Sequence, residues 1–219
     1  MQQFKPILSI ETSDELCSTA IMLTEDSFAE FNFQKKFVHS EKLMPMISTL
    51  LKNADMILDD VGLIAVSMGP GSFTGLRIGL TIAKGLAVGR NIQIIPVPTF
   101  DALALQLCSI LPNNSSFIIA NNANINEIYY AKYKSIGKKY ELITETCLLD
   151  KSEFNNLHAK GDLFFGNYPL VKNNYKISSP NAITIAKWAY IFGKDLVTFD
   201  HDLLEPNYLK NFIVKKNEK

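Results

Sequence analysis

The most specific stretch of the sequence is GPGSFTGLRIGL, which runs from Gly69 to Leu80. It follows the apolar run 63–67, which predicts a strand, and it opens a helical pattern at 74–89. Glycines in a strand-to-helix turn permit tight backbone turns, and unpaired amides at the helix start can hold an anion. The simpler interpretation is a capped turn with Ser72 or Thr74 as the N-cap.

The anion-site interpretation assigns Gly69, Gly71 and Ser72 to a nucleotide phosphate. The stretch is neither GxGxxG nor the phosphate-binding loop that ends in Gly-Lys-Ser/Thr, so neither of these nucleotide motifs is present. Local chemistry therefore favours the structural turn over the nucleotide site.

The helical patterns at 40–54 and 74–89 both carry an apolar face. In the second pattern the polar side chains are confined to one narrow stripe, and the rest of the circumference is apolar or glycine. The stripe consists of Thr74, Arg77, Thr81 and Lys84. Gly75, Gly79 and Ala83 recur every four residues, and such a track lets another backbone approach closely.

The pattern alone supports two interpretations of these apolar faces equally well. One is a central core helix within a single chain. The other is a protein interface, because an exposed apolar patch rarely lacks a partner. The interface hypothesis predicts that Gly79→Leu or Ile47→Asp abolishes partner binding and leaves the monomer folded. Its residues are Leu43, Ile47, Leu50, Gly75, Gly79, Leu80 and Ala83.

The order of the patterns predicts an α/β protein with two lobes. Three strands joined by tight turns predict an antiparallel meander, and a right-handed parallel β-α-β unit follows. The order of strands followed by helices recurs weakly after residue 98. We therefore expect lobes at 1–98 and 99–219, with the chain end returning to the first lobe. Pro45 is tolerable if its helix begins near Glu41. The expected strands are 7–11, 17–23, 28–33, 63–67, 94–97, 117–120, 127–133, 140–148 and 163–165, and the helices are 40–54, 74–89, 100–107 and 182–192.

Composition argues against several classes of function. Lys plus Arg and Asp plus Glu both number 22, and this zero net charge disfavours a self-sufficient nucleic-acid binder. No run approaches the ~20 apolar residues of a membrane-spanning helix, and no signal-peptide core is present. Cys17, Cys108 and Cys147 lack CxxC spacing and are expected as buried thiols in a reducing compartment. We expect a cytoplasmic protein with no membrane contact.

Several segments resemble the TsaB (YeaZ) family. They are ILSIETS at 7–13, His39-Ser40-Glu41 with Leu43 and Pro45, GPGSFTGLRIGL, and EPNYLK at 205–210, where Lys210 replaces the usual arginine. The resemblance spans nearly the whole chain. It implies the fold of the actin/sugar kinase/Hsp70 ATPase superfamily, which is ribonuclease H-like, with two lobes that are each built on a mixed five-stranded sheet.

The resemblance also implies a function. Members of the family are non-catalytic subunits in the synthesis of threonylcarbamoyladenosine, beside the anticodon of tRNAs that read codons beginning with A. They pair with the catalytic paralogue TsaD, and with themselves, through the two helices described above. The ATPase TsaE joins the complex, and TsaC supplies threonylcarbamoyl-AMP. We therefore expect a scaffold for TsaD with only indirect tRNA contact and no intrinsic cofactor, and with ATP or ADP only at the complex interface.

The resemblance indicates that catalysis has been lost. The catalytic paralogue carries two metal-binding histidines four residues apart, and these positions fall on Thr99 and Leu103 here. Neither side chain replaces an imidazole at a metal centre. His39, His158 and His201 are too scattered to suggest a ligand set and are expected at the surface or as caps. We predict no catalytic residue and no metal ligand.

The chain departs from the family pattern at two places where the family carries charged residues. Glu11 stands where the family usually has aspartate, and in kinases of the superfamily that acidic position organises Mg²⁺ and phosphate. The family often has Asp-Ala-Arg where this chain has Asn122-Ala123-Asn124, which removes both charges.

Three alternatives remain open. A phosphotransferase of the same superfamily needs a second glycine-rich loop, but the glycines beyond residue 100 form no close pair. A hydrolase is disfavoured because Ser72 is not in GxSxG. A structural homodimer without a tRNA role differs from the expected subunit only in its partner.

Overall fold

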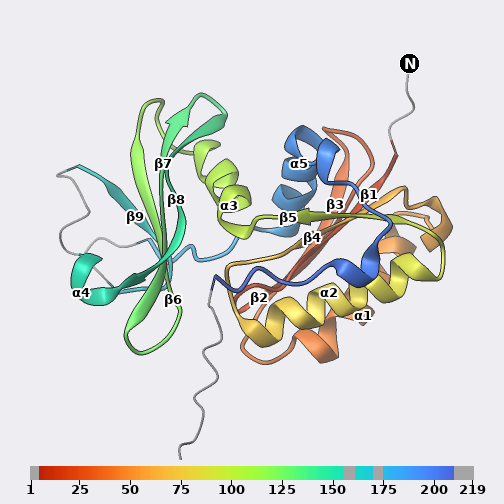
Figure 1. The fold of residues 1–219 in the computed structure, drawn as a ribbon. Coiled ribbons are helices and arrows are strands. Elements are labelled where there is room, and N and C mark those ends of the chain that lie inside the picture. The colour runs from red at the N-terminus through yellow and green to blue at the C-terminus, as the bar shows by residue number, and fades with distance from the viewer. Residues whose placement is uncertain (1–4, 155–160, 170–174, 210–219) are drawn as a thin grey trace, which may run out of the picture.

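The computed structural model describes residues 5–154, 161–169 and 175–209, and these form two lobes, each built on one mixed sheet (Figure 1). The first sheet has the order β3-β2-β1-β4-β5. Its β1, β2 and β3 form the predicted antiparallel meander, and β4 and β5 run parallel to β1. The strands are Ile7–Glu11 (β1), Leu16–Met22 (β2), Phe28–Gln34 (β3), Leu63–Ser67 (β4) and Gln93–Val97 (β5).

Helices cover both faces of the first sheet (Figure 1). The first face packs on α1 (His39–Asn53) and α2 (Phe73–Val88), and the second on α5 (Ala182–Phe192). Side chains alternate along β1, so Leu8 and Ile10 join the core under α1 and α2 while Ile7 joins the core under α5. Burial on both faces explains why the central strands are continuous apolar runs.

The second sheet has the order β8-β7-β6-β9. The resemblance implies five strands, but the described residues form four, and Tyr175 adds only an isolated bridge to Phe165. One face packs on α3 (Thr99–Cys108), which lies between the two lobes (Figure 1). The elements are Ser116–Asn122 (β6), Glu127–Ile136 (β7), Lys139–Asp150 (β8), Lys151–Phe154 (α4) and Leu163–Phe165 (β9).

The chain returns to the first lobe after the second sheet. Beyond α5, Thr198 and Ile94 exchange two backbone hydrogen bonds of 2.9 and 3.0 Å. The amide of Asn207 then donates to the carbonyl of Met68 at 2.7 Å. The first lobe is therefore built from both ends of the sequence. Lys210, the last residue of the EPNYLK segment, lies outside the described residues.

The position of Pro45 differs from the expectation. Because α1 begins at His39, Pro45 lies in its second turn rather than its first. It has no amide to donate to the carbonyl of Glu41, and the helix is continuous through this position. No helix among the described residues is long and apolar enough to cross a membrane.

Candidate functional site

The glycine loop lies against two other segments of the chain. Gly69 has φ +105°, a conformation that favours glycine, and a Cβ there would lie 2.7 Å from the carbonyl oxygen of Asn207. A Cβ on Gly71 would lie 2.5 Å from the carbonyl oxygen of Ser13. These two glycines therefore allow the loop to fit between the end of β1 and the returning chain.

Two of the three residues predicted for a phosphate site use their amides within the protein. The amide of Ser72 donates to the carbonyl of Ser13 at 2.6 Å, and that of Gly69 donates to Oγ1 of Thr99 at 2.9 Å. The hydroxyl of Ser72 accepts from the amide of Gly75 at 3.2 Å, so Ser72 is the N-cap of α2. The capped turn, the simpler interpretation of this loop, is the structure that forms.

The residues predicted for the partner interface lie in the interior of the monomer. Gly75 and Gly79 are buried, and a Cβ on either would collide with Thr12 at the end of β1. The others belong to the core under α1 and α2, where their exposures are 0% for Leu43, 1% for Ile47, 0% for Leu50, 5% for Leu80 and 0% for Ala83. The glycine track therefore brings α2 close to its own sheet, and the expectation that another chain approaches along it is wrong. Gly79→Leu and Ile47→Asp would disrupt the core rather than leave the monomer folded.

A different set of residues forms the outer surface of α1 and α2. The polar stripe predicted on α2 marks its solvent side, where Thr74, Arg77 and Thr81 are exposed and Lys84 is half-buried. A groove of about 490 Å³ lies on this side. It is lined by Ser40, Phe73, Thr74, Arg77, Ile78, Thr81 and Ile82. We name this groove and its rim the α1–α2 surface.

Tyr208, in the C-terminal segment that resembles the family, contacts the start of α2. Nε of Arg77 donates to the hydroxyl of Tyr208 at 2.9 Å. The guanidinium carbon of Arg77 lies 3.9 Å from the ring centroid of Phe73, and the rings of Phe73 and Tyr208 are 4.7 Å apart. The sequence patterns did not predict this contact, although Arg77 lies in the polar stripe of α2 and Tyr208 lies in the segment EPNYLK.

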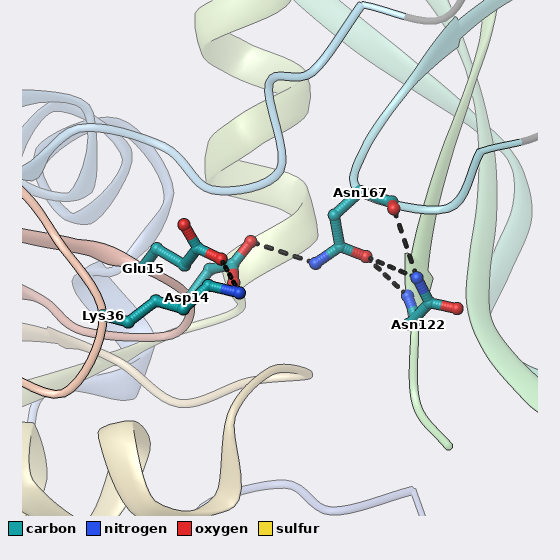
Figure 2. A network of polar contacts seen from close by, with 5 residues as sticks. All are labelled: Asp14, Glu15, Lys36, Asn122 and Asn167. Carbon is teal, nitrogen blue, oxygen red and sulfur yellow. Dashed lines mark hydrogen bonds and ion pairs between the residues drawn. The ribbon is translucent and has the colours of Figure 1, made fainter. Parts of the chain in front are cut away.

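A cavity of about 430 Å³ lies between the lobes. Nδ2 of Asn167 donates to Asp14 of the first lobe at 3.1 Å, and Oδ1 of Asn167 accepts from the amide of Asn122 at 2.7 Å (Figure 2). Asn122, one of the departures from the family pattern, therefore holds Asn167, which makes the contact with the first lobe. The lining residues are Ser13, Asp14, Gly71, Ser72, Phe73, Asn121, Asn122, Ala123, Tyr129, Asn167 and Tyr208. Within the described part of the chain, this lining includes a carboxylate and no cationic side chain, which disfavours a phosphate group here.

The second departure, Glu11, is fully buried at the end of β1. Burial raises the pKa of its carboxyl group to about 7, against the lowering effect of hydrogen bonding from Ser13. The amide of Ser13 donates to Oε1 of Glu11 at 2.5 Å. At neutral pH this carboxyl group is therefore partly protonated, unlike the ionised aspartate that a Mg²⁺ site requires.

The positions aligned with the paralogue's histidines are buried. Thr99 and Leu103 are both 0% exposed, and Leu103 packs in the core between α3 and the second sheet. The prediction that His39 and His201 lie at the surface or cap a helix is wrong. They are buried, and their Nε2 atoms lie 3.2 Å from the carbonyl of Leu16 and 2.9 Å from that of Ile92. His158 lies outside the described residues.

The cysteine prediction holds for two of the three thiols. Cys17 and Cys108 are buried, whereas Cys147 is only half-buried. Burial raises the pKa of all three thiols, and that of Cys17 reaches about 11.

Several relatives of this chain carry the same name. The family model described as "TsaD: tRNA N6-adenosine threonylcarbamoyltransferase" matches residues 36–205. The "tRNA threonylcarbamoyladenosine biosynthesis protein TsaB" of Haemophilus influenzae is 27% identical over 96% of this chain and 95% of its own. The protein of that name from Buchnera aphidicola subsp. Acyrthosiphon pisum is 31% identical over 80% of this chain and 84% of its own.

A solved structure shares the fold. "YeaZ from Pseudomonas aeruginosa" superposes with a TM-score of 0.77 at 23% identity, and the match covers 94% of this chain and all of that one. The α/β fold class with two mixed sheets, expected from the resemblance, is confirmed. A family model matches most of this chain, which also covers 84% of a relative to which it is 31% identical, so the chain belongs to the TsaB (YeaZ) family.

Proposed function

We propose that this chain is a non-catalytic subunit required for threonylcarbamoyl transfer to the adenosine beside the anticodon of tRNAs that read codons beginning with A. It acts as the heterodimer partner and scaffold of TsaD. Its relatives are named for threonylcarbamoyladenosine biosynthesis, and it belongs to their family. The family model that it matches is that of the transferase itself, so subunit and enzyme would share one fold.

The absence of catalysis is supported by the burial of Thr99 and Leu103. The hydroxyl of Thr99 is engaged by the amide of Gly69, and Leu103 is enclosed by apolar side chains. Neither position offers an imidazole or faces the interlobe cavity. A nucleotide belongs at the complex interface rather than in this chain's own cavity, because the described residues that line the cavity include no cation for phosphates.

The main support for the scaffold role is the α1–α2 surface. The groove is mainly apolar, with Ile78 and Ile82 half-buried and Phe73 41% exposed, and Met44 of α1 is 40% exposed. Exposed apolar side chains gathered on two adjacent helices indicate a binding surface. We propose that TsaD binds here, that a second copy of the chain competes for the same surface, that TsaE joins the complex, and that the complex works in the cytoplasm.

Binding to TsaD tests the surface. Ile78→Arg places a long cation in the groove and should weaken TsaD binding by roughly tenfold or more, because burying an unpaired charge is costly. Ile143→Arg is the matched control, since Ile143 is 50% exposed on β8 of the second lobe. Isothermal titration calorimetry of TsaD with each variant measures the effect. Equal affinities for the two variants, or no binding by the wild-type chain, would contradict the proposal.

A further inference from the structure

Phe37 is the most exposed of the large apolar side chains among the described residues, at 95%. It lies between β3 and α1 and has φ +59°. A bulky residue in this left-handed region is a conformational outlier that costs free energy. An aromatic ring in water offsets none of this cost, so the stability of the monomer does not explain a phenylalanine here.

The neighbouring residues fix the position of Phe37. Val38, the next residue, is 5% exposed and belongs to the core under α1 and α2. His39 is 7% exposed, and its Nε2 lies 3.2 Å from the carbonyl of Leu16. On the other side, Nζ of Lys36 pairs with Glu15 at 3.0 Å. The ring therefore projects from a backbone that is anchored on its C-terminal side by Val38 and His39, which lowers the entropic cost of binding through it.

Phe37 lies at the rim of the α1–α2 surface. It lines a hollow of about 400 Å³ together with Ile78 of α2. This hollow shares Ser40, Thr74 and Ile78 with the groove. A partner that covers the groove would therefore also reach the ring.

We propose that Phe37 is the anchor of this surface and inserts into an apolar pocket of the transferase. The inference rests on the proposed function and is continuous with the interface described there. Buried aromatic side chains carry much of the affinity of protein interfaces. The occupant is the transferase, because this chain matches the family model of that enzyme, and partners that share a fold can pair through equivalent surfaces.

Calorimetric titration of TsaD with the full chain tests the anchor. Phe37→Ala should weaken TsaD binding roughly 10- to 100-fold, and Phe37→Trp, which keeps an aromatic ring, should bind within about threefold of wild type. Ile125→Ala is the matched control and should bind as wild type does, because Ile125 is 90% exposed on the second lobe. Phe37→Gly should weaken binding as Phe37→Ala does while raising the melting temperature of the monomer, because glycine relieves the φ of this position.

The outcomes separate the anchor from the proposed function. If wild-type chain binds TsaD and Phe37→Ala binds equally well, the anchor is wrong and the proposed function stands. If the wild-type chain does not bind TsaD at all, the proposed function itself fails. If Phe37→Ala disrupts self-association but not TsaD binding, the ring serves a second copy, and the assignment to the transferase is overturned.

Discussion

The hydroxyl of Thr12 donates a hydrogen bond of 2.8 Å to the carbonyl oxygen of Gly75. Thr12 directly follows β1, and Gly75 lies in the first turn of α2. Together with Gly79, which also faces Thr12, this contact holds α2 against the end of its own sheet. The small residues of α2 are therefore explained by packing within one chain.

Gly79→Ala should lower the free energy of unfolding by about 1–3 kcal/mol, because the added Cβ collides with the hydroxyl of Thr12. Gly85→Ala in the same helix is the matched control. Gly85 is exposed with no atom within 4 Å of an added Cβ, so alanine there should stabilise the helix by about 0.5–1 kcal/mol. Urea denaturation measures both changes, and equal stability of the two variants would contradict the packing described for α2.

Glu11 should make stability depend on pH. Its pKa is raised from 4.5 to about 7 in the folded protein, so its contribution to stability is fully present below about pH 4.5 and is lost as pH rises through 7. The shift corresponds to about 3 kcal/mol at 1.36 kcal/mol per unit. Measured by urea denaturation from pH 5 to pH 8, the stability of wild type relative to Glu11→Gln should therefore fall. A difference between the two proteins that is constant over this range would show that Glu11 titrates normally.

Glu30 of β3 caps α5 across a long sequence separation. Its Oε1 accepts a hydrogen bond of 2.8 Å from the amide of Ile183, in the first turn of the helix. Glu30→Ala should lower the free energy of unfolding by about 1–2 kcal/mol, because the free amide loses a charged acceptor at the positive end of the helix dipole. Glu145→Ala, at an exposed position of β8, should change it by less than about 0.5 kcal/mol. Thermal unfolding distinguishes the two, and an unchanged melting temperature for Glu30→Ala would rule out the cap.

The sequence patterns predict the elements well because the physics that forms them is local or periodic. β1, β4 and β5 are apolar runs buried on both sides, and α1 and α2 repeat with the period of a helix. The patterns did not reveal that α5 covers the first sheet, because the contact of Glu30 with Ile183 joins residues 153 positions apart.

The partner interface was harder to predict. Small residues on a helix allow another backbone to approach closely, but they do not indicate which backbone it is. The spacing of Gly75 and Gly79 suits a neighbouring helix as well as the end of a strand, and only the folded chain shows Thr12 there. The polar stripe was the better guide. A partner can reach α2 only on its exposed side, and Thr74 and Thr81 mark that side.

Reconstituted tRNA modification tests the central claim most directly. Incorporation of radiolabelled threonine into tRNA would be measured with TsaC, TsaD and TsaE, with and without this chain, and with the chain but without TsaD. A non-catalytic scaffold predicts product only when both TsaD and this chain are present, and a reduced yield with Ile78→Arg but not with Ile143→Arg. Full modification without this chain, or modification by this chain in the absence of TsaD, would contradict it.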